Sequence, residues 1–152
     1  MTGKCPILVS ACLLGEPCRY DGGSRPDGNV RELEREYRLV PVCPECLGGL
    51  PTPREPSEIR GDRVVSRTGT DVTAQYRRGA EAALAVAKEN GCRVALLKER
   101  SPSCGAGKVH NGRFDGGLTD GDGITAALLM ENGIAVFGEG EIGAMKLFLQ
   151  KT

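Results

Sequence analysis

Three cysteines in this sequence have both the side chains and the positions needed to bind a metal together. Cys12, Cys43 and Cys104 each lie at the end of a short apolar run, or just past it, and such runs are typical of buried strands. In an open α/β sheet, ligands bind in the crevice beyond the carboxyl ends of the strands. The sequence therefore predicts that three thiols from distant segments meet at one edge of a sheet. The ordinary alternative is that all three pack in the core.

The chain contains seven cysteines, which is a high and odd number. Disulfides are rare in a reducing compartment, so metal binding or catalysis is favoured over a disulfide framework. Cys5 and Cys92 are the two that we expect to pack as small apolar side chains.

Residues 43–46, Cys-Pro-Glu-Cys, leave the kind of site open. The C-x-x-C spacing occurs in zinc sites, redox dithiols and iron-sulfur proteins. A structural zinc needs four ligands, and Cys18 or Cys46 could supply the fourth, so a zinc-binding scaffold is one alternative. A dithiol oxidoreductase that uses Cys43 and Cys46 is another, although it leaves the remaining cysteines without a purpose. Three thiolates and one open coordination position would instead suit an iron that binds a substrate.

Several polar residues near these cysteines could take part in chemistry. Glu45, two residues after Cys43, could donate or accept a proton above a bound metal. Ser101 and Ser103 could begin the turn before the third cysteine, or could hydrogen-bond to a ligand. His110 is the only histidine, and its polar surroundings predict a solvated side chain.

Predicted strands alternate with predicted helices along the chain. The segment between residues 47 and 70 is rich in glycine, proline and charge, which favours a long functional loop or hairpin, and a second hairpin-like stretch ends near residue 120. The alternation predicts an α/β fold, a Rossmann-like three-layer α/β/α sandwich with a short, mostly parallel sheet. The strands are expected over residues 7–12, 38–43, 93–98 and 134–137, and the helices over 29–37, 71–89, 124–130 and 141–149.

Length and charge limit the function further. The 152 residues, 39% of them hydrophobic, suffice for one core, so residues 1–152 are expected to form a single domain. Twenty basic residues balance twenty acidic ones, which argues against a dedicated nucleic-acid or membrane binder. The apolar run 7–12 is too short for a signal peptide or a membrane span, so a cytoplasmic protein is expected.

Six strings in the sequence strongly resemble one family, the former domain-of-unknown-function family 523, which is associated with thiouracil desulfurases. The resemblance spans nearly the whole chain, and its most specific string is Leu-Lys-Glu-Arg-Ser-Pro-Ser-Cys-Gly at residues 97–105. The other five strings lie at residues 10–15, 18–22, 42–45, 48–54 and 69–73.

The resemblance implies an enzyme with a 4Fe-4S cluster. Cys12, Cys43 and Cys104 would be its three ligands, and the fourth iron would be open to the sulfur of a thiolated pyrimidine. Glu45 and Ser101 would be the catalytic pair. The implied reaction is a non-redox desulfuration of 2-thiouracil or a related thiouracil or thiouridine, with release of hydrosulfide. The expected partner is this small molecule, with tRNA less favoured and no membrane or obligate protein partner.

Overall fold

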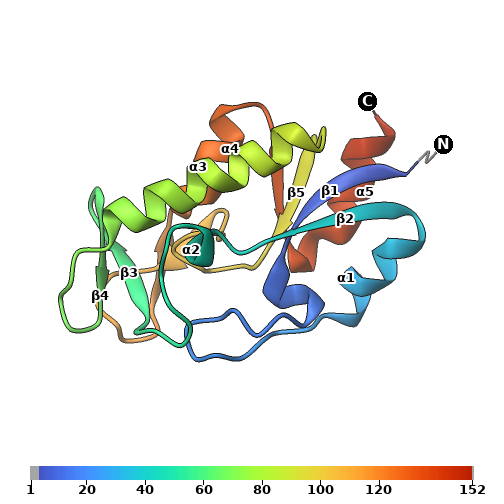
Figure 1. Cartoon of the computed structure of the whole chain (residues 1–152). Coiled ribbons are helices and arrows are strands. Elements are labelled where there is room, and N and C mark those ends of the chain that lie inside the picture. The colour runs from blue at the N-terminus through green and yellow to red at the C-terminus, as the bar shows by residue number, and fades with distance from the viewer. Residues whose placement is uncertain (1–3, 152) are drawn as a thin grey trace.

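The structure, a computed structural model, describes residues 4–151 and is built on a four-stranded parallel sheet (Figure 1). All four expected strands are present, and they pair in the order β2-β1-β5-β8. The chain passes from β1 outward to β2 and then crosses back to β5 on the other side of β1. The direction of winding therefore reverses between β1 and β5, and ligands bind at such a switch point in α/β sheets. The strands are β1 (Cys5–Ser10), β2 (Tyr37–Val42), β5 (Val94–Leu97) and β8 (Ala135–Gly138).

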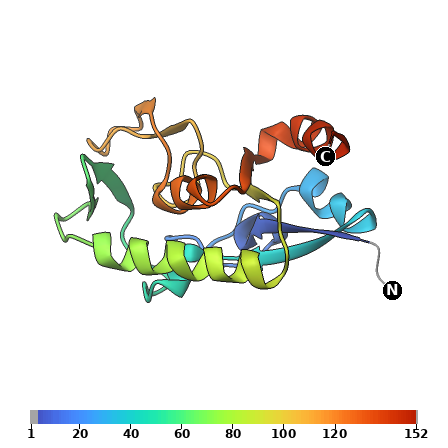
Figure 2. The same ribbon diagram turned by 90° about the horizontal axis from the view of Figure 1, so that it is seen from above.

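Helices cover both faces of the sheet, which confirms the expected three-layer α/β/α fold (Figure 2). On β1, Leu8 packs in one core cluster with residues of α3 and α4, while Ile7 and Val9 pack in the other with residues of α1 and α5. Because both faces are covered, the strand β5 is buried along its whole length rather than alternating. The helices are α1 (Gly28–Glu32), which continues as a 3₁₀ turn, η2 (Leu33–Arg35), and α3 (Thr73–Glu89), α4 (Ile124–Glu131) and α5 (Ile142–Gln150).

Local signals place most helix ends close to where the sequence predicts them. The Asp27 carboxylate accepts hydrogen bonds from the backbone N–H groups of Asn29 and Val30 and so begins α1. The carboxylate of Asp71 accepts a hydrogen bond from the Thr73 N–H at the start of α3, although the N-cap position itself is Val72.

Two antiparallel hairpins occupy the end of the molecule away from the chain termini (Figure 1). They are β3 (Ser57–Arg60) with β4 (Arg63–Ser66), and β6 (Lys108–His110) with β7 (Leu118–Asp120). The sequence indicates both segments as loops or hairpins, and both form hairpins. Three short elements have no counterpart in the sequence prediction: the four-residue helix α2 (Pro44–Leu47) and two 3₁₀ turns, η1 (Ala11–Leu14) and η3 (Glu139–Glu141). Within residues 4–151, no helix has both the length and the apolar character that crossing a bilayer requires.

Candidate active site

A cavity of about 830 Å³ opens beyond the carboxyl ends of the central strands. Its wall includes all five residues predicted from the sequence, so the structure brings them together from three separate segments. They are Cys12, Cys43, Glu45, Ser101 and Cys104. The cavity lies where the winding of the sheet reverses, as the topology requires of a ligand site.

Cys12 and Cys104 are buried, and both line this cavity. Strand β1 ends at Ser10, two residues before its predicted end, so Cys12 lies in the turn η1. A hydrogen bond from the Cys18 thiol holds the pKa of Cys12 below its usual range, against the opposing effects of burial and of the neighbouring Cys104 and Cys43. Burial raises the pKa of Cys104 to about 12. The thiols of three segments thus interact directly or through their charges.

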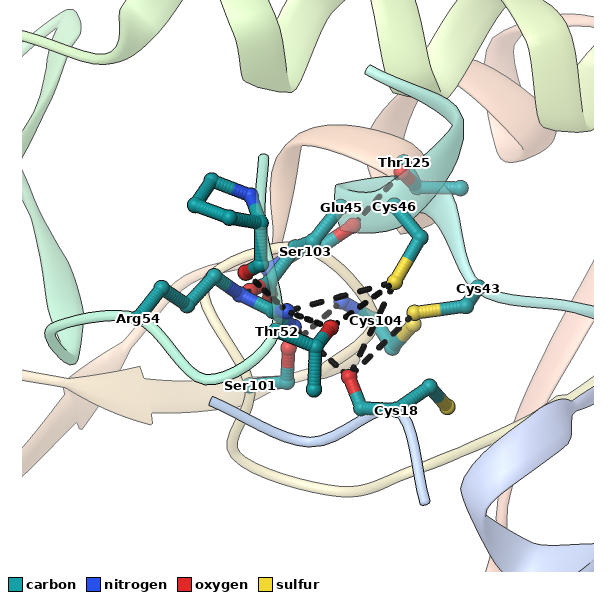
Figure 3. Close-up of polar contacts among 11 residues, drawn as sticks. Cys18, Cys43, Glu45, Cys46, Thr52, Arg54, Ser101, Ser103, Cys104 and Thr125 are labelled. Carbon is teal, nitrogen blue, oxygen red and sulfur yellow. Dashed lines mark hydrogen bonds and ion pairs between the residues drawn. The ribbon is translucent and has the colours of Figure 1, made fainter. Parts of the chain in front are cut away.

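Cys43 lies directly before the short helix α2 and Cys46 lies within it, and both sulfurs point toward the same backbone carbonyl (Figure 3). The Cys43 sulfur lies 3.7 Å from the carbonyl oxygen of Cys18, and the Cys46 sulfur lies 3.9 Å from it. Cys46 is exposed, whereas Cys43 is half-buried. A hydrogen bond to Cys18 and burial raise the pKa of Cys43 above its usual range. All seven cysteines lie in the described part of the chain and are free thiols.

Glu45 projects from α2 into the cavity wall and is paired with a buried arginine. Its Oε1 accepts a hydrogen bond from Arg54 Nε at 2.9 Å, and the side chains of Arg54 and Glu45 are only 7% and 15% exposed. On another side Glu45 lies near the hydroxyl of Tyr76, whose pKa is raised by burial and by the Glu45 charge. The predicted proton carrier is therefore held in a sheltered, polar position at the cavity.

Ser101 organises the loop that carries Cys104. Its Oγ accepts hydrogen bonds from the backbone N–H groups of Ser103 at 3.0 Å and Cys104 at 3.1 Å. Because Oγ acts as acceptor in both bonds, its own proton is available to a molecule in the cavity. The Ser103 hydroxyl instead pairs with Thr125 at 2.8 Å inside the protein, and Ser103 is buried. The turn interpretation therefore holds for the Ser101 side chain, whereas the Ser103 side chain bonds to α4, and of the two only Ser101 lines the cavity.

The same loop is fixed from behind by the first turn of α4. The N–H of Ile124 donates to the carbonyl of Pro102, and the N–H of Thr125 donates to that of Ser103, both at 2.9 Å. The backbone comes so close here that a Cβ at Gly123 would lie 2.4 Å from the Ser103 carbonyl oxygen. Only glycine fits this contact, so the sequence at the start of α4 determines where Cys104 can lie.

Comparison with known proteins identifies the family. The family model described as 2-thiouracil desulfurase matches residues 7–141 of the chain. The chain belongs to this family. This membership confirms the resemblance that the sequence strings indicate, and the match includes the segments that carry all five candidate residues.

Two relatives support the assignment. A solved structure, that of the [4Fe-4S]-dependent thiouracil desulfidase TudS, is 50% identical, with a TM-score of 0.92, and the match covers 98% of this chain and 100% of that one. The uncharacterized protein YbbK of Bacillus subtilis (strain 168) is 45% identical over an alignment of 146 residues, and the match covers 90% of this chain and 97% of YbbK.

In this member of the 2-thiouracil desulfurase family, the cavity wall also contains residues beyond the five predicted ones. The prediction that His110 is solvated is wrong, because this residue is half-buried and lines the cavity. Its Nδ1 is buried without a hydrogen-bond partner in the described part of the chain. Tyr76 and Lys98 also line the cavity. Lys98 directly follows β5 and is expected near the cysteines, whereas no local sequence signal indicates Tyr76, which reaches the site from the first turn of α3.

Among residues 4–151, no three His, Cys, Asp or Glu side chains are arranged to hold a single metal ion.

Proposed function

We propose that this protein hydrolyses the carbon-sulfur bond of a thiolated pyrimidine, 2-thiouracil or a related thiouracil, and releases hydrosulfide. The observation that carries the proposal is the meeting of Cys12, Cys43 and Cys104 with Glu45 and Ser101 at one cavity. Membership of the 2-thiouracil desulfurase family and the thiouracil desulfidase activity named for a 50% identical structure support it.

Cys12, Cys43 and Cys104 would hold a 4Fe-4S cluster of the kind named for the related structure. Thiolates are the usual ligands of such clusters, and these three reach the cavity from the ends of three adjacent strands. The charges of Cys43 and Cys104 act on the pKa of Cys12, which supports treating the three thiols as one donor set. Cys18 and Cys46 remain as neighbouring thiols rather than ligands.

When bound, a cluster with three cysteine ligands supplies one iron that acts as a Lewis acid toward the thiocarbonyl sulfur. The overall reaction replaces the C=S bond with a C=O bond. Water forms the new bond to the ring carbon, the carbon-sulfur bond breaks, and sulfur leaves as hydrosulfide. No electron is gained or lost, so the reaction needs no oxidant or reductant.

The residues around the cavity would then handle the protons. Glu45 accepts a proton from the attacking water and returns it as the sulfur departs, and Ser101 orients the pyrimidine by a hydrogen bond donated from its free hydroxyl. A positioned acid or base of this kind typically contributes about 10²–10⁴-fold to the rate. The Glu45 side chain is only 15% exposed, so its carboxylate is sheltered from bulk water at the cavity wall.

A direct test is a hydrosulfide-release assay on protein reconstituted anaerobically with iron and sulfide. The substrates are 2-thiouracil, 4-thiouracil and the corresponding nucleosides. We expect release of hydrosulfide in equal amount with the oxygen-containing pyrimidine, and loss of both iron and activity in Cys12→Ser, Cys43→Ser and Cys104→Ser.

Cys46→Ser is the matched control, because Cys46 lies on the same helix as Glu45 but is exposed. This variant should keep most of its activity. Loss of activity in Cys46→Ser with iron retained would support a dithiol oxidoreductase instead. Colourless protein that holds about one zinc per chain would support a zinc scaffold.

A further inference from the structure

Arg54 lies at the centre of the polar contacts beside the cysteines, although the proposed chemistry gives it no task of its own (Figure 3). It precedes β3 in the chain, and its side chain is only 7% exposed. A guanidinium is always charged at physiological pH, so its burial is costly unless acceptors surround it.

Each nitrogen of the Arg54 guanidinium has an acceptor. Nε donates to Glu45 Oε1 at 2.9 Å, and Nη2 donates to the Cys18 carbonyl at 2.9 Å. Nη1 donates to the Pro51 carbonyl at 3.0 Å and to Thr52 Oγ1 at 2.9 Å. These contacts fix the plane of the guanidinium, and protein atoms already engage all three nitrogens. Arg54 is thereby placed to orient a neighbour rather than to bind a substrate.

The neighbour that it orients is Glu45. The four residues of α2 give its side chain little support of their own, since so short a helix is marginal without tertiary contacts. Arg54 connects α2 to the loop after η1 through the Cys18 carbonyl, and its own N–H donates to the Tyr20 carbonyl at 2.6 Å. The direction of the Glu45 carboxylate thus depends on a cation anchored outside α2.

We propose that Arg54 is the positioning residue that aims the Glu45 carboxylate at the reacting pyrimidine; this inference rests on the proposed desulfuration. A lysine in its place would keep the charge but would lose the planar fork that contacts Glu45 and the Cys18 carbonyl together. Arg54→Lys should therefore lower kcat by about 10–100-fold, the range typical of residues that orient a functional group. KM and the iron and sulfide content should stay within about twofold of the wild type.

A double-mutant cycle with Glu45→Gln separates positioning from general structural support. If Arg54 acts through Glu45, then Arg54→Lys should cause no further loss of kcat in the Glu45→Gln background, beyond about twofold. Thr52→Val is the matched control, because it removes an acceptor of Arg54 that does not contact Glu45. It should leave kcat within about twofold.

Two results would overturn the proposal. The first is an equal loss from Arg54→Lys in both backgrounds, which would mean that the two residues act independently. The second is a loss of iron in proportion to the loss of kcat, which would make Arg54 a structural connection between the cysteine segments. Arg54→Gln replaces the lysine variant if that variant does not fold, and failure of both to fold would also reject positioning. Wild-type protein that holds its iron but releases no hydrosulfide would reject the proposed function itself.

Discussion

The contact between α2 and α3 gives a sharp test of how the fold positions the site. The two helices approach so closely that a Cβ at Gly79 in α3 would lie 1.9 Å from the carbonyl oxygen of Pro44 in α2. A Cβ at Gly48 would likewise lie 2.0 Å from the Gln75 carbonyl oxygen. Since α2 begins directly after Cys43, any displacement of α2 is a displacement of the site.

We predict that Gly79→Ala damages catalysis more than it damages stability. A carbon approaches a carbonyl oxygen to about 3.3 Å at closest, so the new methyl must push α2 away by about 1.4 Å from the present spacing of 1.9 Å. Alanine gains about 0.5–1 kcal/mol of helix propensity over glycine, while overpacking costs about 1–3 kcal/mol. The expected net destabilisation is about 1–2 kcal/mol, or about 2–8 °C in Tm. A misplacement of about 1 Å can cost about 10²-fold in rate.

The assay pairs thermal unfolding with hydrosulfide release and iron content. The control is Gly143→Ala, because Gly143 also lies in a helix and a Cβ there would meet nothing within 4 Å. Gly143→Ala should be neutral or stabilising by up to about 1 kcal/mol, with normal turnover. If Gly79→Ala also raised Tm and kept wild-type turnover, the argument from the close contact would be refuted.

Three further predictions concern single residues. Glu45→Gln should lower kcat by about 10²–10⁴-fold while iron content stays normal; unchanged turnover would remove Glu45 from the mechanism. Gly123→Ala should lower the iron content, because its Cβ would lie 2.4 Å from the Ser103 carbonyl oxygen; full iron content would show that the Cys104 loop can yield. Hydrogen bonds from Thr73 and Arg63 lower the pKa of Asp71 to about 2. At pH values above the usual aspartate pKa, the ionised Asp71 therefore stabilises the folded state, and this stabilisation is lost as the pH falls toward 2. Asp71→Asn should therefore lower Tm at pH 7, and the difference in Tm from the wild type should vanish near pH 2; a difference that persists there would contradict this linkage.

Much of the fold follows from local sequence patterns. The segments around Leu8 and at Val94–Leu97 are apolar, as strands in a sheet covered on both faces must be. Their apolar character is visible in the sequence. The order of the strands is not visible, since it depends on which side of β1 each crossover takes. The short helix α2 is also hidden, because four residues are too few to show a helical period.

The part of the candidate site that lies at strand ends could be predicted from the sequence. Cys12, Cys43 and Cys104 follow apolar runs, so their convergence follows from the topology of parallel sheets. The pairing of Glu45 with Arg54 and the place of His110 depend on loops that fold back over the sheet. Val109, for example, forms a β-bridge with Arg100 in the loop after β5, and this bridge brings the neighbouring His110 to the cavity. Neighbours in the sequence give no sign of such contacts.

The central claim is that three cysteines hold a cluster whose remaining iron meets the substrate. Mössbauer spectroscopy of protein reconstituted with ⁵⁷Fe, recorded with and without 2-thiouracil, tests it most directly. The account predicts a spectrum of a 4Fe-4S cluster in which about a quarter of the iron signal changes when 2-thiouracil is added, because only one iron lacks a cysteine ligand. A spectrum in which 2-thiouracil changes none of the iron, or a protein that takes up no cluster, would contradict it.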